Sequence, residues 1–158
     1  MTFSLVPCDP EGHPVPGIPD LPEALVGNCQ ATADLYRRVG FVPPWIGYVA
    51  VVGHRGVGGG AFVGPPKDGY VEIAYFTLEE ERCKGYAFQT ASSLVAIVRA
   101  HDPEIGVKAF TLKEVNASTK ILAALGFSMV GVAQDPDAGE VWEWQRPADR
   151  RATPPARE

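Results

Sequence analysis

A strand that runs through a short basic turn into a helix is the feature that most constrains how this chain can fold. Residues 69–78, GYVEIAYFTL, form an apolar run rich in β-branched and aromatic side chains, which predicts a strand. Residues 86–100 carry apolar side chains at helical spacing, which predicts a helix with one buried face. Only residues 79–85, EEERCKG, lie between them. Because the helix must bury its apolar face, we expect it to pack on the sheet that contains the strand.

Similar patterns predict the remaining elements. Apolar runs bounded by glycine and proline predict further strands, at residues 45–53, 59–64, 106–112, 127–133 and 140–146, with a short one at 2–6. Two more helices are expected: one from Pro22 to Gly40, with Asp20 as N-cap, and one over residues 116–126. This order of elements favours an α/β protein of the α+β type, with helices packed on a mixed sheet.

Length and composition fit a single domain and exclude several classes of protein. The chain has 158 residues, and its 46% hydrophobic and 21% charged residues are ordinary globular usage. Residues 1–147 are expected to form the domain, and the polar, proline-containing residues 148–158 to be disordered. A net charge of -5 disfavours a nucleic-acid partner, and no apolar run reaches the roughly 18 residues of a membrane-spanning helix.

The cysteines, the histidines and the N-terminus narrow the possibilities further. The three cysteines have no CxxC spacing and the three histidines are scattered, so we expect neither a disulfide framework nor a metal site. The first residues, MTFSLVPCDPEGHP, lack a basic segment followed by an apolar one, which is not typical of a signal peptide. A cytoplasmic protein is therefore expected.

The basic turn itself has two interpretations. A loop that enters a helix presents unpaired backbone N–H groups and the positive end of the helix dipole, which favour an anion. Gly85 would let a ligand approach the backbone, while Arg82 and Lys84 would add positive charge. Alternatively, the turn is merely solvated and its glycine serves geometry alone. The three acids before the turn, residues 79–81, are expected to be a solvated lead-in to it. The turn matches neither a Walker A loop nor the GxGxxG dinucleotide fingerprint.

Two linked motifs resemble one known family. VEIAYFTLEEERCKGYAFQTA resembles the coenzyme A-binding core of GNAT-superfamily N-acetyltransferases, and NASTKILAALGF resembles the family's second signature. The Glu-Ile-x-Tyr opening is similar to the branch that includes the ribosomal-protein alanine acetyltransferases. The resemblance covers about residues 45–145. It implies a GNAT fold, in which helices flank a single mixed, mostly antiparallel central sheet.

The resemblance implies acetyl-coenzyme A as cosubstrate, without a metal. Tyr75, Phe76 and Thr77 would bond the pantetheine arm as an added strand does. The pyrophosphate would be held, largely by main-chain amides, at Arg82, Cys83, Lys84, Gly85, Tyr86, Ala87 and Phe88. Asn116 resembles the family's pantetheine-contacting asparagine, although it is equally suited to cap the helix that follows.

The reaction needs a base and an acid. A lysine-like amine has a pKa of about 10.4, so a base must remove its proton before it attacks a thioester. Glu72 lies within the apolar strand and is our candidate base, the alternative being an ordinary solvent-facing residue. Many family members use a helical tyrosine as acid, but this chain has Leu122 there. Ser118 resembles a serine found near the leaving sulfur, and capping its helix is the alternative.

These residues predict an acetyl-coenzyme A-dependent N-acetyltransferase that moves the acetyl group directly to a primary amine. The acceptor is expected to be a small molecule. The alternatives are a protein N-terminus or lysine as acceptor, or a non-catalytic coenzyme A-binding sensor. The run at 140–146 is a candidate sheet edge for a homodimer.

Overall fold

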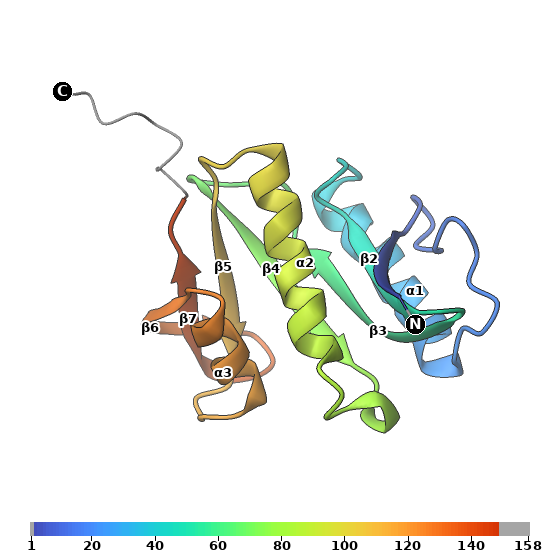
Figure 1. The fold of residues 1–158 in the computed structure, drawn as a ribbon. Coiled ribbons are helices and arrows are strands. Elements are labelled where there is room, and N and C mark those ends of the chain that lie inside the picture. The colour runs from blue at the N-terminus through green and yellow to red at the C-terminus, as the bar shows by residue number, and fades with distance from the viewer. Residues whose placement is uncertain (1, 149–158) are drawn as a thin grey trace.

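One seven-stranded sheet organises residues 2–148, which are the residues that the computed structural model describes (Figure 1). In chain order the elements are β1 (Phe3–Pro7), α1 (Glu23–Val39), β2 (Gly47–Val52), β3 (Arg55–Phe62), β4 (Tyr70–Thr77), the 3-10 turn η1 (Glu79–Glu81), α2 (Tyr86–His101), β5 (Gly106–Thr111), α3 (Ala117–Ala124), β6 (Ser128–Asp135) and β7 (Gly139–Arg146). The strands lie in the order β1-β2-β3-β4-β5-β7-β6. Only β4 and β5 run parallel, so the predicted mixed, mostly antiparallel sheet is confirmed.

The two faces of the sheet carry different helices. In Figure 1, α2 and α3 lie in front of the sheet and α1 lies behind it. Alternate residues of β4 divide accordingly: Val71 and Ile73 are buried with Leu94 of α2, whereas Ala74 and Phe76 lie toward α1. β4 therefore contributes side chains to two layers, one between the sheet and α2 and one between the sheet and α1.

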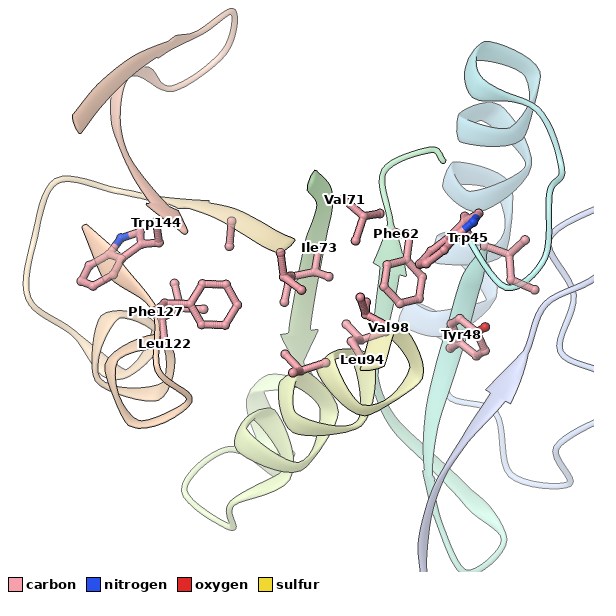
Figure 2. Packing of buried hydrophobic residues seen from close by; sticks show 14 of the residues in the cluster. Trp45, Tyr48, Phe62, Val71, Ile73, Leu94, Val98, Leu122, Phe127 and Trp144 are labelled. Carbon is pink, nitrogen blue, oxygen red and sulfur yellow. The ribbon is translucent and has the colours of Figure 1, made fainter. Parts of the chain in front are cut away.

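The core lies mainly between the sheet and α2. Figure 2 shows Leu94 and Val98 facing Phe62 and Ile73, while Leu122, Phe127 and Trp144 extend the cluster toward α3. Helix α2 approaches β3 closely because β3 has a glycine, Gly60, where it faces the helix. A Cβ at Gly60 would lie 2.9 Å from Thr90 Cγ2 and 3.0 Å from Leu94 Cδ1. The absence of a side chain at Gly60 therefore allows α2 to pack against β3.

The start of α1 differs from the prediction. Its N-cap is Pro22, with no side-chain hydrogen bond, so the prediction of Asp20 as N-cap is wrong. The main chain of Asp20 instead pairs with the β2–β3 turn: its N–H donates to His54 O at 3.0 Å, and its carbonyl accepts from Gly56 N–H at 2.9 Å. A pairing with a distant turn thus overrides the local capping preference.

The predicted edge strand also differs. β7 lies between β5 and β6, so residues 140–146 are not at the sheet edge, and the edge next to β7 is β6. In β6, Met129, Val130 and Val132 are exposed.

No helix among the described residues is long and apolar enough to cross a membrane. The predicted disorder of the C-terminal tail concerns residues that, from 149 on, lie outside the described part of the chain.

Candidate active site

The centre of the sheet opens where β4 and β5 diverge. Only Tyr70–Glu72 of β4 pairs with β5, at Gly106–Lys108, and both strands then continue without pairing to each other (Figure 1). A cleft of about 270 Å³ lies at this divergence. It is lined by Ile73, Ala74, Tyr75, Ala109, Phe110, Thr111, Leu112, Asn116, Ser118 and Leu122. From Ile73 onward, the β4 edge that faces this cleft has no neighbouring strand, so its backbone groups are available to an extended ligand.

Two buried hydroxyls beside this edge are unsatisfied. Tyr75 Oη and Thr77 Oγ1 are inaccessible to solvent and have no hydrogen-bond partner within residues 2–148. A buried polar group without a partner costs about 1–3 kcal/mol, so a ligand that pairs with these hydroxyls would recover that cost. Burial raises the pKa of Tyr75 to about 12, which keeps its phenol protonated and able to donate. The predicted pantetheine residues Tyr75 and Thr77 therefore fit a polar ligand.

Phe76, the third predicted pantetheine residue, points its side chain elsewhere. Its ring packs over Gly59, where an added Cβ would lie 2.9 Å from Phe76 Cε1, on the α1 side of the sheet. The carbonyl of Phe76 also lies toward β3 and not toward the open edge, since an added Cβ at Gly58 would be 2.3 Å from it. Strand alternation explains the difference, because consecutive side chains face opposite sides.

The loop before α2 leaves the start of that helix open. Gly85 is the N-cap with φ +85° and provides no side-chain cap, and Cys83 also adopts a left-handed φ of +66°. Gln89 N–H is the first to bond back, to Gly85 O at 3.1 Å. The preceding N–H groups, those of Tyr86, Ala87 and Phe88, lie in the first turn, where helix geometry gives them no carbonyl partner. The structure thus brings the predicted anion-binding residues together at one helix N-terminus.

Glu81 holds this loop, which the sequence interpretation missed. It is 8% exposed, so the prediction that all three acids are solvated is wrong for Glu81, although Glu79 and Glu80 are exposed. Its carboxylate accepts from Arg55 Nε at 2.9 Å, Arg55 Nη2 at 3.1 Å and Lys84 Nζ at 3.0 Å. These hydrogen bonds lower the pKa of Glu81 to about 2. The i,i+3 spacing to Lys84 is visible in the sequence, whereas the contact with Arg55, in another hairpin, has no local signal.

Glu72 is half-buried on the α1 face of β4. Burial raises the pKa of its carboxyl, the nearby charge of Lys108 opposes this rise, and Asp135 and Glu143 add to it. Lys108 is the residue paired with Glu72 across β4 and β5. A carboxylate with a raised pKa is a better base than an exposed one, so the environment suits the predicted role.

Asn116 and Ser118 have different roles at the N-terminus of α3. Asn116 Oδ1 accepts from Thr119 N–H at 3.2 Å, and Thr119 Oγ1 accepts from Asn116 N–H at 2.9 Å, which makes a capping box. The N-cap interpretation of Asn116 is confirmed, and the capping alternative for Ser118 is wrong. Both residues line the cleft, so Ser118 is left facing it without a structural role at the helix start.

A second groove lies on the opposite face of the sheet. It measures about 330 Å³ and lies between α1, β3 and β4. Its lining comprises Asn28, Ala31, Thr32, Leu35, Arg38, Gly60, Ala61, Val63, Ala74, Tyr75 and Phe76. Ala74 and Tyr75 line both spaces, so the cleft and the groove meet at the point where β4 leaves β5. In the described chain, no group of three or more His, Cys, Asp or Glu residues could hold a metal ion.

Comparisons with known proteins agree on the architecture. No protein-family model matches the sequence, and no curated protein matches it significantly. Among solved structures, RimL, a ribosomal L7/L12 alpha-N-protein acetyltransferase, matches with a TM-score of 0.66 at 16% identity, over 94% of this chain and 95% of RimL. The ribosomal-protein-S5-alanine acetyltransferase from Vibrio fischeri matches with a TM-score of 0.61 at 16% identity, over 80% and 72%.

A third match has coenzyme A bound. Aminoglycoside acetyltransferase AAC(6')-Ib in complex with coenzyme A has a TM-score of 0.57 at 16% identity, over 68% of this chain and 69% of its own. The fold of this chain is therefore that of the GNAT acetyltransferases, as its two motifs predicted.

Proposed function

We propose that this protein is an acetyl-coenzyme A-dependent N-acetyltransferase that acts on the primary amine of a small molecule. The meeting of two spaces across one strand is the observation that carries this proposal. The cleft opens on the α2 and α3 side of β4, the groove opens on the α1 side, and both reach Ala74 and Tyr75. Such a passage lets a donor and an acceptor enter from opposite faces and meet at the sheet's centre.

The chain's own groups fit coenzyme A along this path. The open N–H groups at the start of α2, with Arg82 beside them, would hold the pyrophosphate. The unpaired edge of β4 would bond the pantetheine amides, and the unsatisfied hydroxyls of Tyr75 and Thr77 would gain partners. Solved structures with this fold include one with coenzyme A bound, which supports the same assignment.

The chemistry follows from the two faces of β4. When bound, acetyl-coenzyme A supplies the thioester carbonyl that the amine attacks. Glu72, on the acceptor side, accepts the amine's proton directly or through water as the new carbon–nitrogen bond forms. Ser118, on the donor side, donates to the sulfur as the carbon–sulfur bond breaks. No covalent enzyme intermediate is required, so the free, exposed Cys83 is assigned no nucleophilic role.

The size of the groove favours a small acceptor. A space of about 330 Å³ is at the lower end of the usual range for small-molecule sites. The second candidate is a protein N-terminus or lysine, favoured by the fold's likeness to RimL and to the S5-alanine acetyltransferase. The cytoplasmic location and the homodimer stay predictions.

Glu72→Gln tests the proposal together with its rival, a non-catalytic coenzyme A-binding module. Turnover with a panel of amines and peptides should fall about a hundredfold or more, because general-base catalysis is worth about 10²–10⁴. The coenzyme A Kd, measured by calorimetry, should stay unchanged. Because the pKa of Glu72 is raised, the rising limb of kcat/KM against pH should lie above the ordinary carboxylate range and be absent from the variant.

Glu104→Gln, at an exposed position, is the matched control and should keep full activity. Tight coenzyme A binding by the wild type without acetylation of any amine or peptide would favour the non-catalytic module and sink the enzyme proposal.

A further inference from the structure

The acceptor groove contains a single formal charge. Of the described residues that line it, only Arg38 is charged, and none is acidic. The other walls are mainly apolar or small, among them Ala31, Leu35, Ala61 and Phe76. A cationic acceptor such as a polyamine would find no counter-charge in this lining, whereas an anionic group would find one.

Arg38 and the neighbouring Arg37 differ in their hydrogen bonds and ion pairs. Arg37 forms an ion pair with Asp34 on α1. Arg38 makes no hydrogen bond or ion pair within the described residues, and it lines the groove. It lies in the last turn of α1, where the helix dipole stabilises a cation. The guanidinium is therefore available to bind a planar anion through two parallel hydrogen bonds.

The place of Arg38 along the groove sets the geometry of the acceptor. The last turn of α1 lies over the end of β3, because a Cβ at Gly64 would lie 3.2 Å from Val39 Cβ. At the same end, Val63 N–H donates to Glu72 O at 2.9 Å. Val63 lines the groove together with Arg38, and Glu72 lies next to this end without lining the groove, so a short acceptor bound at Arg38 would direct its amine toward the proposed base.

We propose that the acceptor is a small amino-carboxylate, whose carboxylate is bound by Arg38 while its amine points toward Glu72. This inference rests on the proposed function and specifies its substrate class. The apolar walls accommodate a short carbon chain between the two groups, and Arg38 determines that the far end is an anion.

Three four-carbon amines that differ only at their far end test this inference: 4-aminobutyrate, 4-aminobutanamide and 1,4-diaminobutane. With wild-type protein, kcat/KM should be about tenfold higher for the carboxylate than for the amide, and lowest for the diamine. The corresponding three-carbon set checks the spacing. Equal rates within both sets, or preference for the diamines, would overturn the inference and leave the proposed function standing.

Variants of Arg38 assign the preference to this residue. Arg38→Gln should bring the carboxylate and amide within about twofold of each other, and Arg38→Lys should keep part of the preference. The ratio of variant to wild type for each acceptor cancels the differences between amine pKa values. Arg37→Gln, which removes the neighbouring cation, is the control and should leave the preference unchanged. A preference that survives in Arg38→Gln would refute the role of Arg38.

A binding measurement separates this inference from the proposed function. Titration of the coenzyme A-loaded protein with 4-aminobutyrate, followed by NMR, should show saturable binding in the wild type and about tenfold weaker binding in Arg38→Gln. Arg38-dependent binding without acetylation of any amine would overturn the proposed function alone. Acetylation of amines without Arg38-dependent carboxylate binding would overturn the inference alone.

Discussion

Helices α2 and α3 both begin at a junction with a preceding loop, yet their N-termini differ. At α3, Asn116 and Thr119 form a reciprocal capping box that satisfies the N–H groups of these two residues from within the chain. At α2, Gly85 caps the helix without a side chain. A helix start that is already capped has little left to offer a ligand. The uncapped start of α2 is therefore the stronger candidate for the anion site, whereas α3 lines the cleft and places Ser118 in it.

The two junctions also differ in what holds them. The loop before α3 is fixed by its own cap, whereas the loop before α2 is fixed by Glu81, which bonds Arg55 and Lys84. An uncapped helix start needs such external support if its N–H groups are to stay oriented toward a ligand. We draw three predictions from this comparison.

Blocking the uncapped N-terminus of α2 should have the largest effect, a loss of coenzyme A affinity. Gly85→Val places a branched Cβ where the ligand's phosphates would lie, and it strains a backbone with φ +85°. The coenzyme A Kd should rise at least about a hundredfold by calorimetry. Gly139→Val is the matched control, since Gly139 has φ +78°, begins β7 directly after the β6–β7 turn and is equally free of neighbours within 4 Å. If both variants bind coenzyme A equally well, the site lies elsewhere.

Removing the external support should have an intermediate effect. Glu81→Gln leaves Arg55 and Lys84 without their carboxylate, and we expect a loss of about 2 kcal/mol in the free energy of unfolding. Coenzyme A affinity should fall about tenfold as the loop loosens. Urea unfolding and calorimetry measure the two quantities. Glu80→Gln, one residue earlier and exposed, should change neither.

Acid unfolding gives the same prediction a second readout. The folded pKa of Glu81 is lowered from 4.5 to about 2, so its stabilising contribution is fully present above about pH 4.5. It is lost as the pH falls through the folded value. Wild-type protein should therefore lose more stability between about pH 4.5 and 2 than Glu81→Gln does. Parallel acid profiles would mean that Glu81 does not hold the loop.

Removing the side-chain cap of α3 should have the smallest effect on coenzyme A affinity. Asn116→Ala removes one half of the capping box and should cost about 1 kcal/mol in the free energy of unfolding. Coenzyme A affinity should change less than about threefold, because the side chain of Asn116 serves the cap. A larger loss of affinity, with stability unchanged, would instead support the pantetheine contact that the sequence resemblance implied.

Much of the site could be predicted because its signals are local. The alternation of β4, the loop with Gly85 and the cap at Asn116 each depend on neighbours within a few residues. Other contacts could not be predicted, because they join distant segments. Glu81 meets Arg55 at a separation of 26 residues. Asp20 likewise leaves its expected capping position to pair with a turn.

The groove and the sheet edge lacked local signals for the same reason. That Arg38 lines a groove depends on how α1 lies on β3 and β4. That β6 rather than β7 forms the sheet edge depends on strand order, which hydrophobic patterns do not specify. Phe76 was assigned to the ligand by its motif position, although strand alternation could have placed its side chain on the other face.

Two of the glycines in β3, Gly58 and Gly60, bear on how such a chain can diversify. An added Cβ at Gly58 would lie 2.3 Å from Phe76 O, and one at Gly60 would meet α2, so both positions are closed to larger residues. Ala61 lines the groove on the face away from α2. A larger side chain there would shorten the groove without touching the central helix. Under the proposed function, acceptor range can therefore evolve at one position of this strand while its neighbours preserve the fold.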